Sequence, residues 1–358
     1  MSEFTVQACG PHDRGAQAQL FSACFKKSTD SAGLAWRYDQ NPHGRALSFV
    51  QRASSGEFVS GYACSPRRAV PSGDEARSAI VGETGDVMTH PAWRKRGLFS
   101  ALDVAAMAEA RQLGWPIVFG LPNRRSAHIF LELGWERVGT LRPWAFVLRD
   151  GRAAREERAK EGRLRGWLTP LAARSGRAAR ARLRSGAPLR AQRLTAFPRE
   201  VADLSRRVEP RFALMVRRDA DYLDWRFLRG PAGLHRAIAL YDGPRLAAYV
   251  VVQVPRPGES IGYLVDLLAA DDAGVAAALE AGLAALEGVG ASVVQATAID
   301  GSWWNGVLSG AGFQPPRAEN HLTVIVHVHD ATHPLGQAAR DPRRWYLTDG
   351  DRDDETMG

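Results

Sequence analysis

The segment that decides the fold of this protein is "THPAWRKRGLFSAL" (residues 89–102). The residues before it, "GETGDVMTH" (82–90), predict a β-strand that a following proline ends, because proline cannot donate a hydrogen bond to a sheet. The residues after it, "LFSALDVAAMAEARQLG" (98–114), predict a helix, because apolar side chains recur every three or four positions before a final glycine. The turn between this strand and this helix therefore consists of a glycine, Gly97, and three basic residues, Arg94, Lys95 and Arg96.

This turn has the composition of a phosphate-binding loop. A helix N-terminus exposes unpaired backbone N–H groups and the positive end of the helix dipole, which stabilise a nearby anion by about 0.3–1 kcal/mol. Gly97 lets the backbone approach a ligand closely, and the basic side chains add positive charge. The sequence thus predicts a binding site for phosphate groups at this turn.

The composition is that of a globular protein long enough for two domains. The chain has 358 residues, of which 45% are hydrophobic and 24% are charged. Its net charge of +8 and its isoelectric point of about 9.8 favour anionic partners. Because much of the basic excess lies between Arg149 and Arg199, the net charge describes that segment more than any active site.

The three cysteines, Cys9, Cys24 and Cys64, lie in the first quarter of the chain without metal-ligand spacing. They predict neither a disulfide framework nor a zinc site, and we expect no metal cofactor. The sequence contains neither a signal peptide nor an apolar run long enough to cross a bilayer. The expected location is therefore the reducing cytoplasm.

A repeat divides the chain into two similar halves. "LAWRYDQNPHG" (34–44) has a counterpart in "LDWRFLRGPAG" (223–233). In both halves, β-like segments follow, then an aspartate in a strand-like stretch (Asp86 and Asp266), a long Ala/Leu-rich helix, a short strand, a second helix and a Gly-aromatic pair. Because these landmarks occur in the same order, the sequence predicts two copies of one mixed α/β unit.

Between the two copies lies a segment rich in arginine and alanine, 150–192. It is either a solvated helical linker or a basic amphipathic surface for peripheral contact with anionic lipid. Trp167 is its one aromatic residue, which gives no support for stacking on bases, so we expect no nucleic-acid partner. The acidic end of the chain lacks the aspartate–glycine spacing of an EF-hand calcium loop. The expected divisions are an N-terminal domain, a linker, a C-terminal domain and a tail, at 1–149, 150–192, 193–330 and 331–358.

The segment 89–102, together with "GLPNRRSAHIFLELGWERVG" (120–139), resembles the GNAT superfamily of N-acetyltransferases, and the repeat resembles its long bacterial tandem members. That family binds coenzyme A with a loop of the pattern [QR]-x-x-G-x-[GA], followed by a helix that begins with N-x-x-A. The resemblance implies an α/β fold (mixed, α+β-like) of two tandem GNAT-like units, each a mostly antiparallel sheet flanked by helices. It also implies acetyl-coenzyme A (acetyl-CoA) as the cofactor.

Carried over position by position, the family pattern assigns cofactor contacts to the end of the strand, the loop and the second helix. These residues are Met88, Thr89, Arg94, Lys95, Arg96, Gly97, Leu98, Phe99, Ser100, Asn123, Ser126 and Phe130. Phe99 departs from the pattern, which has Gly or Ala there, and Phe130 stands where many members have a tyrosine that protonates the leaving thiolate. A phenyl ring has no proton to give, so either another acid serves or the thiolate leaves unprotonated.

The second copy departs further at the corresponding loop. Its segment "LLAADDAGVAAALEAGL" (267–283) has aspartates where the first copy has arginines, and two carboxylates repel a phosphate group. We therefore expect only the first copy to bind coenzyme A. The second copy is then structural or contributes substrate-binding surface.

Acetyl transfer to an amine requires a neutral nucleophile, and an amine of pKa about 9 is only about 1% neutral at pH 7. The candidates for the base are two carboxylates on the cofactor strand, Glu83 and Asp86, with His90, His128 or a water chain as alternatives. Period-two alternation places the two carboxylates on opposite faces of the strand unless a bulge intervenes. The repeat partner of Asp86, Asp266, favours a structural role for Asp86.

Two further groups of residues are candidates for the acceptor site. Trp36 and Arg37 belong to the repeated motif, and they form either its packing unit or a wall of the acceptor pocket. If the tail folds over the acceptor cleft, Tyr346, Asp349 and Asp351 would be placed to bind a cationic or hydroxylated substrate.

Together these features predict an acetyl-CoA-dependent N-acetyltransferase whose acceptor is a small amine or an amino sugar. The long family members that it resembles suggest a role in bacterial surface polysaccharide synthesis. Two alternatives stay open at this point. The protein could transfer another acyl or aminoacyl group, or it could be a non-catalytic protein that binds anionic surfaces through 150–192.

Overall fold

The computed structural model describes residues 4–25, 28–148, 180, 183, 189–315 and 321–352. The chain divides into two compact units, each built from two separate stretches. Unit 1 comprises Met1–Gly139 and Thr323–Asp341, and unit 2 comprises Thr140–Leu322 and Pro342–Gly358. Most of the predicted linker, 150–192, lies outside the described residues. None of the described helices is long and apolar enough to cross a membrane.

Unit 1 contains one mixed sheet. Its strands are β1 (Val6–Ala8), β2 (Leu47–Arg52), β3 (Phe58–Val70), β4 (Ala79–Thr89), β5 (Ile117–Gly120) and β13 (Leu322–Val328). They lie in the order β1-β2-β3-β4-β5-β13, and neighbours pair antiparallel except β4 and β5, which are parallel. The helices of the unit are α1 (Arg14–Cys24), α2 (Ser31–Asp39), α3 (Leu98–Gln112), α4 (Arg124–Glu132) and α11 (Pro334–Ala338).

Helices cover both faces of this sheet. On the face that we call the α1–α2 face, the buried helix residues are Leu20, Phe21, Leu34 and Tyr38. On the opposite face, the α3–α4 face, they are Leu102, Ala106, Met107, Ala110 and Phe130. In α3 these side chains recur at three- and four-residue spacing, so the periodicity in the sequence is what places this helix on the sheet.

Unit 2 repeats this plan. Its strands are β6 (Glu136–Val147), β7 (Arg190–Leu194), β8 (Leu214–Val216), β9 (His235–Asp242), β10 (Arg245–Gln253), β11 (Ile261–Ala269), β12 (Val293–Ile299) and β14 (Trp345–Tyr346). The main sheet has the order β6-β12-β11-β10-β9-β7, with β11 and β12 parallel, and β14 pairs with β8. The helices are α7 (Val201–Val208), α8 (Ala220–Leu223), α9 (Asp272–Gly288) and α10 (Trp303–Gly310).

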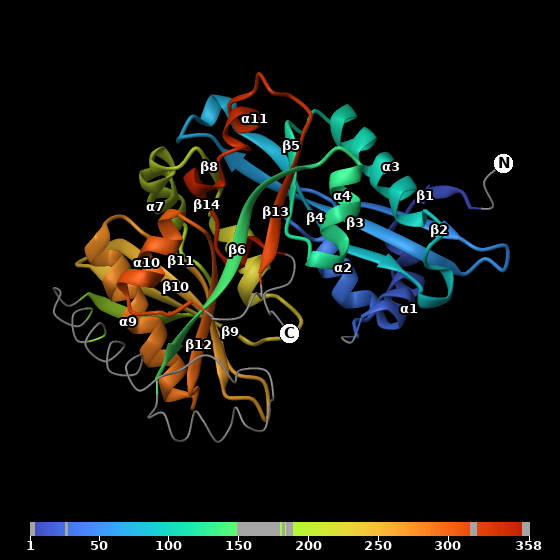
Figure 1. Cartoon of the computed structure of the whole chain (residues 1–358). Coiled ribbons are helices and arrows are strands. Elements are labelled where there is room, and N and C mark those ends of the chain that lie inside the picture. Colours follow the sequence, from blue (N-terminus) through green and yellow to red (C-terminus); the bar gives the residue numbers. More distant parts are fainter. Residues whose placement is uncertain are drawn as a thin grey trace. The chain divides into compact units, whose positions relative to one another are not determined.

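Each unit takes one strand from the opposite half of the sequence. β13, near the end of the chain, pairs with β5 of unit 1, and β6, which ends the first copy, pairs with β12 of unit 2 (Figure 1). Ile325 of β13 is fully buried in the core of unit 1, while Trp144 and Phe146 of β6 lie in the core of unit 2. The domain boundaries expected at 149 and 193 follow the order of the chain. The two compact units instead exchange a strand, so each unit contains residues from both halves of the chain.

Candidate active site

Strands β4 and β5 of unit 1 separate at one point in the sheet. Their parallel pairing runs from Gly82 with Val118 to Thr84 with Gly120. β5 ends there, whereas β4 continues to Thr89 with β3 as its partner. The two strands therefore diverge beside residues 85–89, and this divergence is the centre of the candidate site.

A β-bulge lies on β4 within this divergence. Gly85 and Met88 make successive pairs with β3, but they are three residues apart on β4 and oppose residues two apart on β3. Asp86, inside the bulge, has a φ of 47°, a left-handed conformation that aspartate tolerates better than most residues. The extra residue shifts the alternation of side chains along the strand.

Because of this shift, Glu83 and Asp86 lie on the same face of the sheet. Met88 packs among the α1 side chains on the α1–α2 face, and the carboxylate of Asp86 contacts two side chains of α2 on that face. Ser65 and Ala63 are two residues apart on β3 and therefore share a face, and Ala63 packs against α2. Glu83 pairs with Ser65, so its side chain also lies on the α1–α2 face. Period-two alternation without a bulge would have separated the two carboxylates.

Asp86 is held by two residues of the repeated motif. Nη1 of Arg37 donates to Oδ2 of Asp86 at 2.5 Å, and the hydroxyl of Tyr38 donates to the same oxygen at 2.6 Å. The guanidinium of Arg37 also lies 6.0 Å from the centre of the Phe21 ring. The side chains of Arg37 and Asp86 keep 26% and 9% exposure, and Trp36 beside them on α2 is half-buried. The motif therefore positions a partly accessible carboxylate at the divergence.

Glu83 is enclosed more completely than Asp86. Its side chain is 1% exposed, and Oε2 accepts a hydrogen bond from Nη2 of Arg67 at 3.1 Å in a buried ion pair. Removing one partner of such a pair leaves a buried charge and typically costs about 3–5 kcal/mol. This environment favours a structural role for Glu83.

The loop after β4 has the backbone of an anion site. A short 3-10 turn, Pro91–Trp93, follows the strand, Lys95 has a φ of 64°, and Gly97 has a φ of 72° at the N-cap of α3. Because glycine has no side chain, it leaves the first N–H groups of α3 without the cap that Ser or Asp would provide. The three basic residues are exposed, and the guanidinium of Arg96 lies 4.8 Å from the centre of the Trp93 ring.

A hollow of about 370 Å³ adjoins this helix terminus. Its lining residues come from the start of the chain, β2, the loop and α3, and they are Phe4, Thr5, Val6, Gln51, Arg96, Gly97, Leu98 and Ala101. A side-chain carbon built onto Gly97 would meet no atom within 4 Å, so the space in front of the helix terminus is clear. These features fit the pyrophosphate of a nucleotide cofactor.

Phe99, the departure from the family loop pattern, does not face this hollow. Its ring is directed into the α3–α4 face, where it lies 4.9 Å from Phe130 in an edge-to-face contact and 6.4 Å from Tyr62. Phe130 in turn contacts Trp135 at 5.0 Å and is 2% exposed. The two departures are thus partners in one aromatic cluster on the α3–α4 face.

The remaining candidates from the sequence lie around the loop and α4. Thr89, Ser100 and Ser126 are half-buried, and Oδ1 of Asn123 accepts the N–H of Ser126 at 3.2 Å, which caps the first turn of α4. His128 is exposed on α4. His90 caps the 3-10 turn by accepting the N–H of Ala92. Among the described residues, no group of three or more His, Cys, Asp or Glu side chains is arranged to hold a metal ion.

One buried carboxylate near the site was missed by the sequence analysis. Asp103 of α3 is 1% exposed, and it accepts hydrogen bonds from the hydroxyl of Tyr62 at 2.9 Å and from Nε1 of Trp135 at 3.1 Å. Burial raises the pKa of this carboxyl from 3.8 to about 6, and the two hydrogen bonds partly oppose the rise. The available signal in the sequence was a single acidic residue on the apolar side of the helix, next to Leu102. Its hydrogen-bond donors, Tyr62 and Trp135, lie on other elements, so the sequence did not reveal them.

We expect the substitution Asp103→Asn to make the stability of unit 1 less dependent on pH. Folding raises the pKa of Asp103, so its stabilising contribution is complete below about pH 4 and is lost as the pH rises through about 6. A shift of about two pKa units corresponds to about 3 kcal/mol. Between pH 4 and pH 7, where most of this contribution is lost, urea unfolding should show the wild type losing about 2 kcal/mol relative to the variant. Parallel pH dependences of the two proteins would contradict this assignment.

The tail residues that the sequence linked to the acceptor are buried in unit 2. Tyr346, Asp349 and Asp351 are each 1% exposed. Asp351 pairs with Arg218, and Asp349 accepts the N–H of Thr297 at 2.7 Å. Their side chains are therefore engaged in the interior of that unit, which gives them a structural role there.

Among known proteins, a family model matches part of this chain by sequence, and solved structures match nearly all of it by fold. The family described as "Acetyltransferase (GNAT) domain" matches residues 7–138. No curated protein matches the sequence significantly.

Three solved structures share the fold across most of the chain. A probable N-acyltransferase from Enterococcus faecalis V583 aligns with a TM-score of 0.64 at 13% identity, covering 93% of this chain and 74% of its own. A GCN5-related N-acetyltransferase from Anabaena variabilis aligns with a TM-score of 0.62 at 12% identity, covering 92% and 73%. A tandem GNAT protein from the clavulanic acid biosynthesis pathway aligns with a TM-score of 0.57 at 15% identity, covering 91% and 99%. At these identities the likeness establishes the fold.

Proposed function

We propose that the protein transfers the acetyl group of acetyl-CoA to the nitrogen of a small amine or amino sugar, because residues 7–138 match the GNAT acetyltransferase domain. The observation that carries the proposal is the divergence of β4 from β5, which leads directly into the uncapped N-terminus of α3. The end of β4 thus supports both a phosphate-binding site and the position at which the acetyl thioester would react.

On the donor side, the chain offers backbone and charge. The N–H groups at the start of α3 and the exposed side chains of Arg94, Lys95 and Arg96 would hold the pyrophosphate. Met88 and Thr89, at the end of β4, would lie beside the pantetheine arm. When bound, acetyl-CoA supplies a thioester that a neutral amine can attack.

On the acceptor side, Asp86 is the better placed of the two candidate bases. Its side chain is partly exposed at the bulge, while Glu83 is enclosed with Arg67. A carboxylate at this position would attract a cationic acceptor and take up the proton that the amine loses when it attacks the thioester. Forming the neutral amine from an ammonium of pKa about 9 costs about 2.7 kcal/mol at pH 7. Arg37 and Tyr38 keep the carboxylate in one orientation. We therefore assign Asp86 to the acceptor and Glu83 to the support of the strand.

The proposal is tested by a thiol-release screen of amines and nucleotide amino sugars, with an acceptor-free control. The amino sugars used in surface polysaccharides are tested first. In parallel, acetyl-CoA at about 100 times its Kd should stabilise the protein by about 2.7 kcal/mol, which a thermal melt detects. Acyl-CoA thioesters with longer chains are included, because release from these alone would favour transfer of a different acyl group. No thermal shift with any thioester would overturn the proposal.

We expect Asp86→Asn to lower kcat by about 100-fold or more while leaving the thermal shift caused by acetyl-CoA nearly unchanged. The amide keeps the shape of the side chain but cannot accept a proton, and general base catalysis typically contributes about 10²–10⁴-fold. The control is Glu57→Gln, which alters an exposed carboxylate of the same unit. A kcat within threefold of the wild type in both variants, roughly the spread of surface mutations, would remove Asp86 from the mechanism.

A further inference from the structure

The divergence of two parallel strands is repeated in unit 2. β11 and β12 pair from Ile261 with Val293 to Tyr263 with Gln295. Both strands then continue, to Ala269 and Ile299. Asp266, the repeat partner of Asp86, lies on β11 beyond the last of these pairs. Unit 2 therefore has the framework of a second cofactor cleft.

Residues 347–352, near the end of the chain, lie between these diverging strands; we call them the segment below. On the β12 side, the carboxylate of Asp349 accepts the backbone N–H of Thr297 at 2.7 Å and also its hydroxyl proton. On the β11 side, the hydroxyl of Thr348 donates to Oδ1 of Asp266 at 2.7 Å. A Cβ on Gly350 would come within 3.2 Å of the Cβ of Asp266. The segment thus bonds to both strands and leaves no room between itself and β11 for a larger residue at Gly350.

The segment also engages the repeat partner of Arg37. Arg226 occupies in "LDWRF" the place of Arg37 in "LAWRY". Its Nε donates to the carbonyl oxygen of Gly350 at 3.0 Å, and its Nη2 donates to the carbonyl oxygen of Arg352. The counterpart of the arginine that contacts the candidate base in unit 1 therefore binds the backbone of this segment in unit 2.

The charged side chains of this segment form ion pairs within unit 2. Nη2 of Arg218 lies 2.6 Å from Oδ2 of Asp351 and 3.4 Å from Oδ1 of Asp266, and Arg352 lies 2.8 Å from Asp349. Each of these five side chains is at most 5% exposed. Buried charges are costly unless they are paired, so this arrangement is a built site with a fixed occupant.

The other end of the second cleft is filled in the same way. α9 corresponds to α3, but its N-cap is Asp271, whose side chain accepts the N–H of Gly274 at 2.8 Å. In unit 1 the equivalent position is Gly97, which has no side chain. A carboxylate of the chain therefore stands in unit 2 where the phosphate of a cofactor would stand in unit 1.

We propose that Leu347–Arg352 is the permanent internal ligand of the second cleft, so that unit 2 binds no acyl-CoA and needs this segment for the order of its diverging strands. The resulting count of one cofactor per chain rests on the proposed function of unit 1. The role of the segment in unit 2 does not rest on it, and the two are tested separately.

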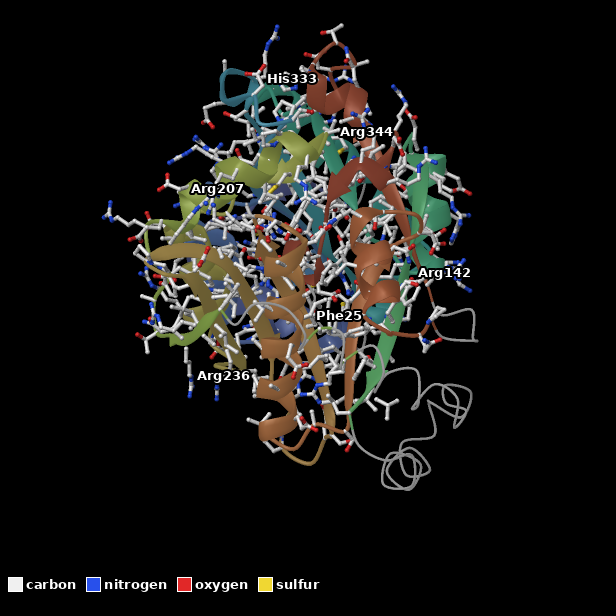
Figure 2. All side chains as sticks on the ribbon, turned by 90° about the vertical axis from the view of Figure 1, so that its left-hand side faces the viewer. Phe25, Arg142, Arg207, Arg236, His333 and Arg344 are labelled. Carbon is white, nitrogen blue, oxygen red and sulfur yellow. The ribbon has the colours of Figure 1, made fainter. Side chains whose placement is uncertain are left out.

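The role of the segment is tested by hydrogen exchange on the full chain with Asp349→Ala. The amide of Thr297 should exchange at least about tenfold faster, because its buried acceptor is lost, while the amides of β4 keep their rates. The matched control is Asp300→Ala, which removes an ion pair with Arg142 whose side chains are 40% and 44% exposed; Figure 2 shows Arg142 at the edge of the molecule. This control should leave the Thr297 rate unchanged. An unchanged rate in Asp349→Ala would overturn the proposal.

A general loss of structure in Asp349→Ala is distinguished from local opening by a second variant. Asp349→Asn keeps a carbonyl oxygen for the Thr297 N–H but loses the charge that pairs with Arg352. Its Thr297 rate should lie between those of the wild type and Asp349→Ala, with β9 and β10 still protected. A variant in which all amides of unit 2 accelerate equally would show that the segment is not a local ligand.

The cofactor count is measured by calorimetric titration of the wild-type chain with acetyl-CoA. One site per chain supports the proposal, and two sites overturn it. Absence of binding would overturn the proposed function of unit 1, while agreeing with a closed cleft in unit 2, and the hydrogen-exchange result then decides the role of the segment.

Discussion

Replacing Gly97 with glutamate should weaken acetyl-CoA binding by about 1,000-fold. The carboxylate would lie at the uncapped N-terminus of α3, where like unit charges about 4 Å apart repel by about 4 kcal/mol at an effective dielectric constant of about 20. Since about 1.4 kcal/mol corresponds to tenfold in affinity, repulsion alone accounts for most of this loss. The φ of 72° adds backbone strain for any residue with a Cβ. Calorimetric titration with acetyl-CoA measures the change.

The matched control for this variant is Gly114→Glu, at the other end of α3. Gly114 has a φ of 73°, and a Cβ there also meets no atom within 4 Å, so the two substitutions carry similar strain and the same charge. Gly114→Glu should lower the melting temperature but keep the affinity for acetyl-CoA within about threefold, since it lies outside the first turn of the helix. Equal losses of affinity in both variants would mean that strain, and not the phosphate site, explains the effect.

A fragment of residues 1–149 should fail to form a stable domain, although it contains the first copy as the sequence defines it. It lacks β13, which pairs with β5 along Ile117–Gly120 and places Ile325 in the core of unit 1. Removing one buried isoleucine side chain typically costs about 2–5 kcal/mol, and a domain is stable by only about 5–15 kcal/mol. Loss of the whole strand also exposes the edge of β5 to other chains. We expect no cooperative melting transition and aggregation in gel filtration.

The control for the fragment restores the missing strand. A chain in which 1–139 is joined through a flexible Gly/Ser linker to 321–341 contains all of unit 1. It should melt cooperatively and, under the proposed function, bind acetyl-CoA. If 1–149 instead melts cooperatively at the temperature of the linked chain, β13 contributes nothing to the stability of unit 1.

The resemblance of the first copy to the GNAT family and the tandem fold were both predicted from the sequence. The family model matches residues 7–138, and the structural likeness confirms the tandem fold. The strand before Gly97, the turn and the helix after it lie where the periodicity and the glycine placed them. These features are local, because strand and helix periods repeat within about a dozen residues and a positive φ at a helix start selects glycine. The expected loss of the phosphate loop in the second copy is likewise visible in the sequence, as aspartates in place of arginines.

The roles of individual side chains in the site depended on the tertiary structure. Phe99 looked too large for a phosphate loop until its contact with Phe130 showed that the ring points into the core. Asp103 drew no attention in the sequence because its partners, Tyr62 and Trp135, are more than thirty residues away along the chain. The faces of Glu83 and Asp86 depended on a bulge whose position is set by pairing with β3.

By itself, the sequence determined the turn at Gly97, the repeat and the family match of residues 7–138, because each of these is encoded in short runs of neighbouring residues. Only the tertiary structure decided that β6 and β13 are exchanged between the units and that Leu347–Arg352 lies in the second cleft. The physical reason is that strand exchange and an internal ligand arise from hydrogen bonds between segments far apart in the chain. A strand edge accepts any partner whose backbone and side chains fit, and neither composition nor period specifies which segment that is.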